Sequence, residues 1–178
     1  MTTTGKIELM APAGNFESLQ AALDNGADSI YFGVEQLNMR ARASINFTLD
    51  DLKEISERCK AKNVRTYLTL NTIIYDHDLT IVKTLLQKAK DADITAVIAM
   101  DQAVIASARA IGMEVHISTQ INITNIETAR FYAMFADTMV LSRELSLRQV
   151  KKITEQIEKE NVCGPSGKLV EIEIFGHG

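Results

Sequence analysis

Seven short runs of apolar and β-branched residues alternate along this chain with segments of helical periodicity. The runs cover residues 7–10, 29–32, 64–70, 96–100, 114–118, 138–141 and 169–175. Strands that alternate with helices pair in parallel through right-handed crossovers. The alternation therefore predicts an α/β fold around one parallel sheet. No internal boundary interrupts it, so we expect residues 1–178 to form a single domain.

Two architectures fit this alternation, a (β/α)₈ barrel and an open, doubly wound sheet. The open sheet is less favoured because no predicted strand is followed by a GxGxxG turn. Polar residues recur at the end of every strand, which is where a barrel carries its site. A closed barrel needs about 250 residues, and this chain has 178. We therefore expect a partial parallel (β/α)₈ TIM-type barrel with seven strands present and the eighth missing.

Charge and hydropathy narrow the classes of partner. The chain has 23 acidic and 19 basic residues, which argues against a general nucleic-acid binder but leaves room for a local cationic pocket. It contains no apolar run of 18 residues, and its first residues lack the pattern of a signal peptide. Its two cysteines, Cys59 and Cys163, fit a reducing compartment. We expect a cytoplasmic protein without a membrane span.

Strand alternation predicts which polar side chains face the interior of the barrel. In the fifth strand, His116, Ser118 and Gln120 share one face, while Val115 and Ile117 share the other. The apolar face should meet the helices, so the polar face should point inward. Buried polar groups cost roughly 1–3 kcal/mol each if they stay unpaired. A polar interior therefore implies a shared hydrogen-bond network, a bound ligand, or both.

The third and seventh strands repeat the pattern. The inward residues are Tyr67, Thr69 and Asn71 in the third strand, and Glu171, Glu173, Phe175 and His177 in the seventh. Our candidates for acid–base chemistry are His177, Glu173 and His116, each with a structural hydrogen-bonding role as the alternative. Glu8 and Glu171 lie nearer the strand starts, where pairing with a base such as Arg65 is the expected role.

Three arginines, Arg40, Arg42 and Arg143, fall near the predicted mouth of the barrel. Arginine suits bidentate recognition of a carboxylate or phosphate, so we expect a small anionic ligand there. The alternative for each is an ordinary surface arginine. Further candidates for ligand contacts at the strand ends are Tyr31, Asn71, Gln120, Asn122 and Glu144.

Familiar hydrolytic and nucleotide-binding motifs are missing from the sequence. It has no HExxH, GxSxG or Walker pattern. Cys59 lies on an apolar helical stripe and is expected in the core, and Cys163 has no partner cysteine in its loop. The sequence therefore offers no metal site and no recognisable nucleophile with a base and an orienting group.

The strand-end motifs resemble the peptidase U32 family, the "collagenase-like" proteins. The matching stretches are ELMAPAGN (8–15), YFG (31–33), LNMRA (37–41), LTLNT (68–72), HISTQIN (116–122) and LSRELS (141–146). The family signature opens with Glu-x-Phe-x-x-Gly, which Glu173, Phe175 and Gly178 supply. Gly176 departs from the usual aliphatic residue. On this resemblance we expect residues 1–178 to be the N-terminal part of a longer protein.

The resemblance implies chemistry that differs from the family name. Relatives include proteins for hydroxylation of a tRNA wobble uridine, of a ribosomal RNA cytidine, and in ubiquinone synthesis. It implies an iron–sulfur cluster whose cysteine ligands lie beyond the signature glycine, prephenate as the oxygen source, and a tRNA or rRNA partner. Three hypotheses follow for this chain: part of an RNA-hydroxylating protein, part of a collagenase-like peptidase, or an inactive scaffold when it stands alone.

Overall fold

The computed structural model describes residues 7–34 and 47–176, which form one seven-stranded sheet with its helices. The strands are β1 (Met10–Pro12), β2 (Ser29–Phe32), β3 (Arg65–Leu70), β4 (Ala96–Ala99), β5 (Glu114–Ile117), β6 (Thr138–Val140) and β7 (Glu171–Glu173). The α-helices are α1 (Phe16–Asp24), α2 (Leu52–Lys60), α3 (Leu79–Asp91), α4 (Gln102–Ala110), α5 (Ile126–Ala133) and α6 (Leu147–Glu160). Short 3₁₀ helices η1 (Asp76–Asp78) and η2 (Thr119–Ile121) follow β3 and β5.

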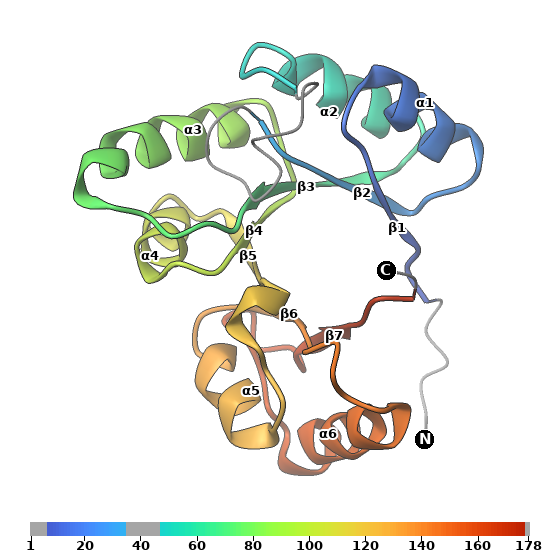
Figure 1. Ribbon diagram of the computed structural model, residues 1–178, viewed down its shortest axis with the longest axis vertical. Coiled ribbons are helices and arrows are strands. Elements are labelled where there is room, and N and C mark those ends of the chain that lie inside the picture. Colours follow the sequence, from blue (N-terminus) through green and yellow to red (C-terminus); the bar gives the residue numbers. More distant parts are fainter. Residues whose placement is uncertain (1–6, 35–46, 177–178) are drawn as a thin grey trace.

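The sheet runs in chain order from β1 to β7, and every pair of neighbours is parallel. It curls so that the helices lie around its outside, with β1 and β7 as its two outer strands (Figure 1). A doubly wound sheet would reverse its strand order and carry helices on both faces. The predicted partial barrel with seven strands is therefore confirmed.

Two edges of the sheet differ from the sequence prediction. β1 begins at Met10 rather than at residue 7, since the backbone N–H of Leu9 donates to the side chain of Asp28 and not to a strand. β7 begins at Glu171 because Leu169 bridges antiparallel to Cys163 in the preceding turn, and it ends at Glu173, which pairs with Val140, the last residue of β6.

The packing separates two apolar regions. The main core lies between the helices and the outward face of the sheet, with residues such as Leu68, Val97 and Ile117 fully buried. A second, smaller cluster forms on the inward face and contains Tyr67, Ala96 and Ile98, with Met10 and Tyr31 packed against it. The interior of the barrel therefore holds aromatic and polar side chains in place of a purely aliphatic filling.

Capping fixes where helices start next to the strand ends. Ser146 and Gln149 form the capping box of α6, in which each side chain accepts from the other residue's backbone N–H. Along α6, Ile153 and Ile157 are buried, whereas Leu147 is 76% exposed. Leu147 is the first residue of the helix, ahead of the turns that pack on the sheet.

Within the described ranges, no helix combines the length and apolar character that crossing a membrane requires.

Candidate functional site

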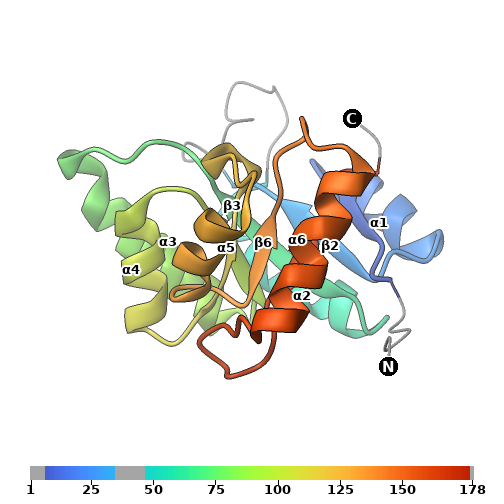
Figure 2. The ribbon, with the colours of Figure 1, turned by 90° about the horizontal axis from the view of Figure 1, so that it is seen from below.

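The carboxyl ends of the strands gather at one end of the molecule. β6 points toward this end, and the β3–α3 loop, η2 and the β6–α6 loop all lie there (Figure 2). Parallel strands in a barrel bring their carboxyl ends to the same face, which carries the chemistry in such folds. We call this face the mouth, and the inward face of the strands below it the interior.

His116 lies at the centre of the interior. Its side chain is buried, and its Nε2 is 3.0 Å from Oε1 of Glu114, two residues earlier on β5. Its ring also contacts the ring of Tyr67, with centroids 4.5 Å apart. Sequence alternation placed His116 inward, and this prediction is confirmed. The contacts with Glu114 and Tyr67 fix the orientation of the imidazole.

The Glu114 contact assigns the tautomer of His116. A carboxylate accepts hydrogen bonds only, so the neutral imidazole carries its proton on Nε2. Nδ1 is then an acceptor, and it is buried without a hydrogen-bond partner among the residues that the structure describes. Leaving such an atom unpaired costs roughly 1–3 kcal/mol. The interior therefore offers a proton acceptor whose partner is not supplied by the described side chains.

Tyr67 connects His116 to an ion pair near the strand starts. Its hydroxyl donates to Oε1 of Glu8 at 2.7 Å, and the other carboxylate oxygen of Glu8 pairs with Arg65. Burial raises the pKa of Tyr67 to about 12, against a smaller opposing effect of Arg65. The expected pairing of Glu8 with Arg65 is confirmed, whereas Glu171 is exposed.

Glu173 ends β7 and is half-buried. Burial raises the pKa of its carboxyl above the ordinary value, and the charge of His116 acts more weakly in the opposite direction. A carboxyl group with a raised pKa retains its proton at higher pH and can donate it. Glu173 is therefore suited to the role of proton donor, and His116 Nδ1 to that of acceptor.

Ser142, Arg143 and Glu144 lie at the rim of the mouth, in the loop after β6. The Ser142 hydroxyl donates to the carboxylate of Glu144, and this bond holds the pKa of Glu144 below its ordinary value. The exposed guanidinium of Arg143 lies over the ring of Phe175, 4.5 Å from its centroid. Arg143 thus makes a cation–π contact with Phe175, and its charge also helps to lower the pKa of Glu144 beside it.

The remaining candidates around the mouth differ in their surroundings. Tyr31 is half-buried on the inward face of β2, and Asn71 is half-buried directly after β3. Gln120 lies within η2, where its backbone N–H donates to the Ser118 hydroxyl. Asn122 is exposed and ends η2 with a left-handed backbone (φ 56°). Asparagine adopts this conformation more readily than most residues, so the turn by itself explains why an asparagine stands here. Their ligand contacts stay predictions.

Three predicted site residues, Arg40, Arg42 and His177, lie outside the described residues. Tyr67 and Glu114 were not among the predicted site residues, although both contact His116. The signal for Glu114 was present, because it precedes His116 and Ser118 on the same face of β5. The contact between Tyr67 and His116 left no signal in the sequence, because it crosses the intervening strand β4.

Histidine, cysteine and acidic side chains are the possible ligands of a metal ion or cluster. No group of three His, Cys, Asp or Glu side chains that could hold a metal occurs within residues 7–34 and 47–176. Cys59 is fully buried in the core stripe of α2, where burial raises the pKa of its thiol to about 11. Cys163 lies in the turn before β7. These side chains do not fit an iron–sulfur cluster, which binds several thiolates.

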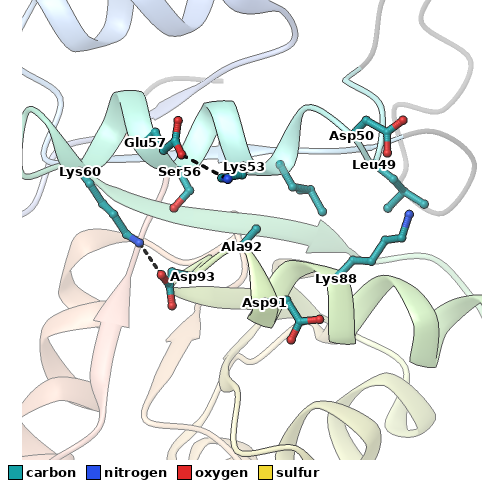
Figure 3. A pocket seen from close by; sticks show the side chains of 11 residues that line it. Leu49, Asp50, Lys53, Ser56, Glu57, Lys60, Lys88, Asp91, Ala92 and Asp93 are labelled. Atoms are coloured by element: carbon teal, nitrogen blue, oxygen red, sulfur yellow. Dashed lines mark hydrogen bonds and ion pairs between the residues drawn. The ribbon is translucent and has the colours of Figure 1, made fainter.

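A groove on the outside of the barrel runs between α2 and α3 (Figure 3). Its charged side chains include Lys60, which pairs with Asp93 at 2.7 Å, and Lys53, which lies 3.9 Å from Glu57. Its lysines are thus largely offset by acidic neighbours. The groove has no contact with the interior cluster, so we place the candidate site at the mouth and interior.

Comparison with known proteins identifies the family that shares this geometry. The model of peptidase family U32 matches residues 14–178. The chain belongs to peptidase family U32. Its fold resembles that of the U32 peptidase Mk0906, with a TM-score of 0.70 at 14% identity over 98% of this chain and 70% of that one.

Two relatives carry different functional names. A protein named collagenase, from Porphyromonas gingivalis, is 53% identical over 96% of this U32 chain and 41% of its own length. The tRNA hydroxylation protein P1 of Bacillus subtilis is 31% identical over 98% of this chain and 39% of its own length. The chain thus spans about two fifths of the length of these curated relatives.

Proposed function

We propose that the intact protein containing this chain takes part in the oxygen-independent hydroxylation of an RNA base, of the tRNA wobble-uridine type. The similarity to the Bacillus subtilis tRNA hydroxylation protein P1 carries the proposal, because it extends over 98% of the chain. Ribosomal RNA is the alternative substrate within the same reaction class. An RNA substrate would place the protein in the cytoplasm.

The interior supports acid–base chemistry of the kind that this reaction needs. Hydroxylation of a pyrimidine carbon replaces C–H with C–OH, so the oxygen donor must supply the hydroxyl group, and a proton and two electrons must leave the ring. His116 Nδ1 is an acceptor in a buried position, and its orientation is fixed by Glu114. Glu173 faces the same interior with a raised pKa. We assign proton acceptance to His116 and proton donation to Glu173, with His177 a further candidate beyond the described residues.

An oxygen donor must also bind. We propose a small carboxylate such as prephenate, held at the rim by Arg143, whose guanidinium is exposed over Phe175. Arg40 and Arg42 are the further candidates from the sequence. The polar side chains of Asn71 and Gln120 would complete the contacts with the donor and the base.

Redox chemistry would come from an iron–sulfur cluster in the intact protein. The residues of this chain do not supply its ligands, because Cys59 is buried in the core and Cys163 lies in the turn before β7. We therefore propose that the C-terminal remainder of the same protein holds the cluster. No step above is assigned to it.

Mass spectrometry of nucleosides tests this function directly. A strain without the gene is expected to lose one hydroxylated nucleoside, a uridine in tRNA or a cytidine in rRNA, and the wild-type gene is expected to restore it. An unchanged nucleoside profile in both RNA classes would reject the proposal. The 178-residue chain alone is expected to restore nothing, as an inactive scaffold would.

The second candidate is a collagenase-like peptidase, favoured by the 53% identity to the Porphyromonas gingivalis collagenase. Of the two serines at the mouth, Ser142 donates its hydroxyl proton to Glu144, and the Ser118 hydroxyl accepts from the backbone N–H of Gln120. Neither shows the serine–histidine hydrogen bond of a hydrolase among the described contacts. Gelatin cleavage by the purified intact protein, abolished by His116→Ala, would favour the peptidase over RNA hydroxylation.

A further inference from the structure

The β3–α3 loop carries two stacked rings at the mouth. The rings of Tyr75 and His77 are parallel and offset, with centroids 5.7 Å apart and planes 2° from parallel. Both side chains are exposed, Tyr75 to 62%. Exposed aromatic side chains that lie together on a surface loop often mark a site of interaction. The pair therefore presents a flat aromatic surface that the fold itself does not cover.

The loop holds this surface in a fixed position. The backbone N–H of Ile74 donates to Asp101, which also caps α4, and the Ile74 side chain packs against the main core. Asp78 holds the turn that carries both rings, because one carboxylate oxygen accepts from the Tyr75 backbone N–H and the other lies 3.5 Å from His77 Nε2. Because the loop backbone is already held, binding has few further rotatable bonds to order, which favours a ligand that stacks on the rings.

The surface lies at the same end of the molecule as the candidate site, where the loop runs outward from β3 to the start of α3 (Figure 1). Asn71, a predicted contact with the base or its oxygen donor, begins the same loop, and the loop lies at the end of the molecule where the strands end (Figure 2). A strand of RNA that places one base in the interior has to leave the mouth over its rim, and this loop is one part of that rim.

We propose that the Tyr75–His77 pair binds a nucleobase of the same single-stranded RNA that carries the modified base, farther along the strand. This inference rests on the proposed function, since it takes RNA as the substrate. Proteins hold unpaired bases by stacking them on aromatic side chains. The acidic residues Asp76 and Asp78 flank the rings, so the surface receives the face of a base and not a phosphate.

Fluorescence of 2-aminopurine in a short single-stranded RNA tests the stack. The wild-type intact protein is expected to bind the probe and quench it, and Tyr75→Phe is expected to do the same. Tyr75→Ala is expected to weaken binding at least fivefold, equally at low and high salt, because stacking releases no counterions. The control is Phe131→Ala, which removes a ring of 53% exposure from α5, far from the mouth, and should change nothing.

The outcomes separate this inference from the function on which it rests. Equal affinity of Tyr75→Ala and the wild type would overturn the stack while RNA modification in cells still supported the function. An equal loss in Phe131→Ala would overturn it too, because the effect would then follow exposed aromatic area in general, as for a protein partner. A wild-type protein that binds no probe would also overturn it. Failure of the function shows instead in the nucleoside profile.

Discussion

His116 on β5 and Tyr67 on β3 touch across the strand that separates them, with ring centroids 4.5 Å apart. β4 lies between, and it presents Ala96 at the level of Tyr67. A larger residue in place of Ala96 would occupy the space in which the two rings meet. The small side chain on β4 is therefore part of what positions the imidazole.

Tyr67 is expected to contribute to stability in two separable parts. Tyr67→Phe removes only the hydrogen bond to Glu8, so we expect the free energy of unfolding to fall by about 1 kcal/mol. Tyr67→Ala also removes the buried ring, for which about 3–5 kcal/mol is expected. Urea unfolding measures both. Equal losses in the two variants would show that the ring contacts with His116 contribute nothing.

The raised pKa of Glu173 predicts how the stability of the protein changes with pH. Its pKa is raised in the folded state, so between the ordinary value and the raised one the folded protein binds more protons than the unfolded chain. The contribution of Glu173 to stability therefore falls as the pH rises through that window. Urea unfolding measures this effect. The free energy of unfolding of Glu173→Gln, minus that of the wild type, should be more positive at pH 7 than at pH 4.

The matched control for this prediction is Glu171→Gln, which removes an exposed carboxylate two residues earlier on the same strand. It reports what the loss of one negative charge does by itself. If both variants changed the pH dependence equally, burial of Glu173 would not be its cause.

Gly164 is expected to tolerate no side chain. A Cβ at this position would lie 2.8 Å from the Cα of Asp137 and 2.9 Å from the carbonyl oxygen of Ala136. Backbone atoms cannot move aside, so Gly164→Ala should cost about 1–3 kcal/mol by thermal or urea unfolding. Gly14→Ala is the control, because its Cβ would meet nothing within 4 Å. A stable Gly164→Ala protein would contradict the packing of this turn against β6.

Iron binding gives a prediction for the two cysteines. If the cluster ligands lie in the remainder of the intact protein, Cys59→Ala and Cys163→Ser should each leave the iron content of anaerobically purified protein unchanged. Burial raises the pKa of the Cys59 thiol to about 11, which disfavours the thiolate that iron requires. Loss of iron in either variant would assign a ligand to this chain.

Local sequence patterns were sufficient for the fold and for part of the site. Period-two alternation in β5 and β7 placed His116 and Glu173 inward, because a strand turns successive side chains to opposite faces. The pairing of Glu8 with Arg65 followed from their position near the strand starts. The inward placements depend on one strand at a time, whereas the Glu8–Arg65 pair joins two segments whose opposite charges lie at the same end of the sheet.

Features that depend on side-chain packing between strands or on loop conformation were not predicted. The Tyr67–His116 contact depends on the small side chain of Ala96 in an intervening strand, and the length of β7 depends on the partner residues that β6 offers. The Tyr75–His77 stack depends on the loop conformation that Asp78 holds. Neither contact leaves a periodic pattern in the sequence.

Complementation of the deletion strain with His116→Gln tests the central claim, that the interior residues serve RNA hydroxylation. Nucleoside mass spectrometry should show that the variant, at wild-type abundance and stability, restores none of the missing modification, while the control Glu171→Gln restores it in full. Full restoration by His116→Gln would contradict the account.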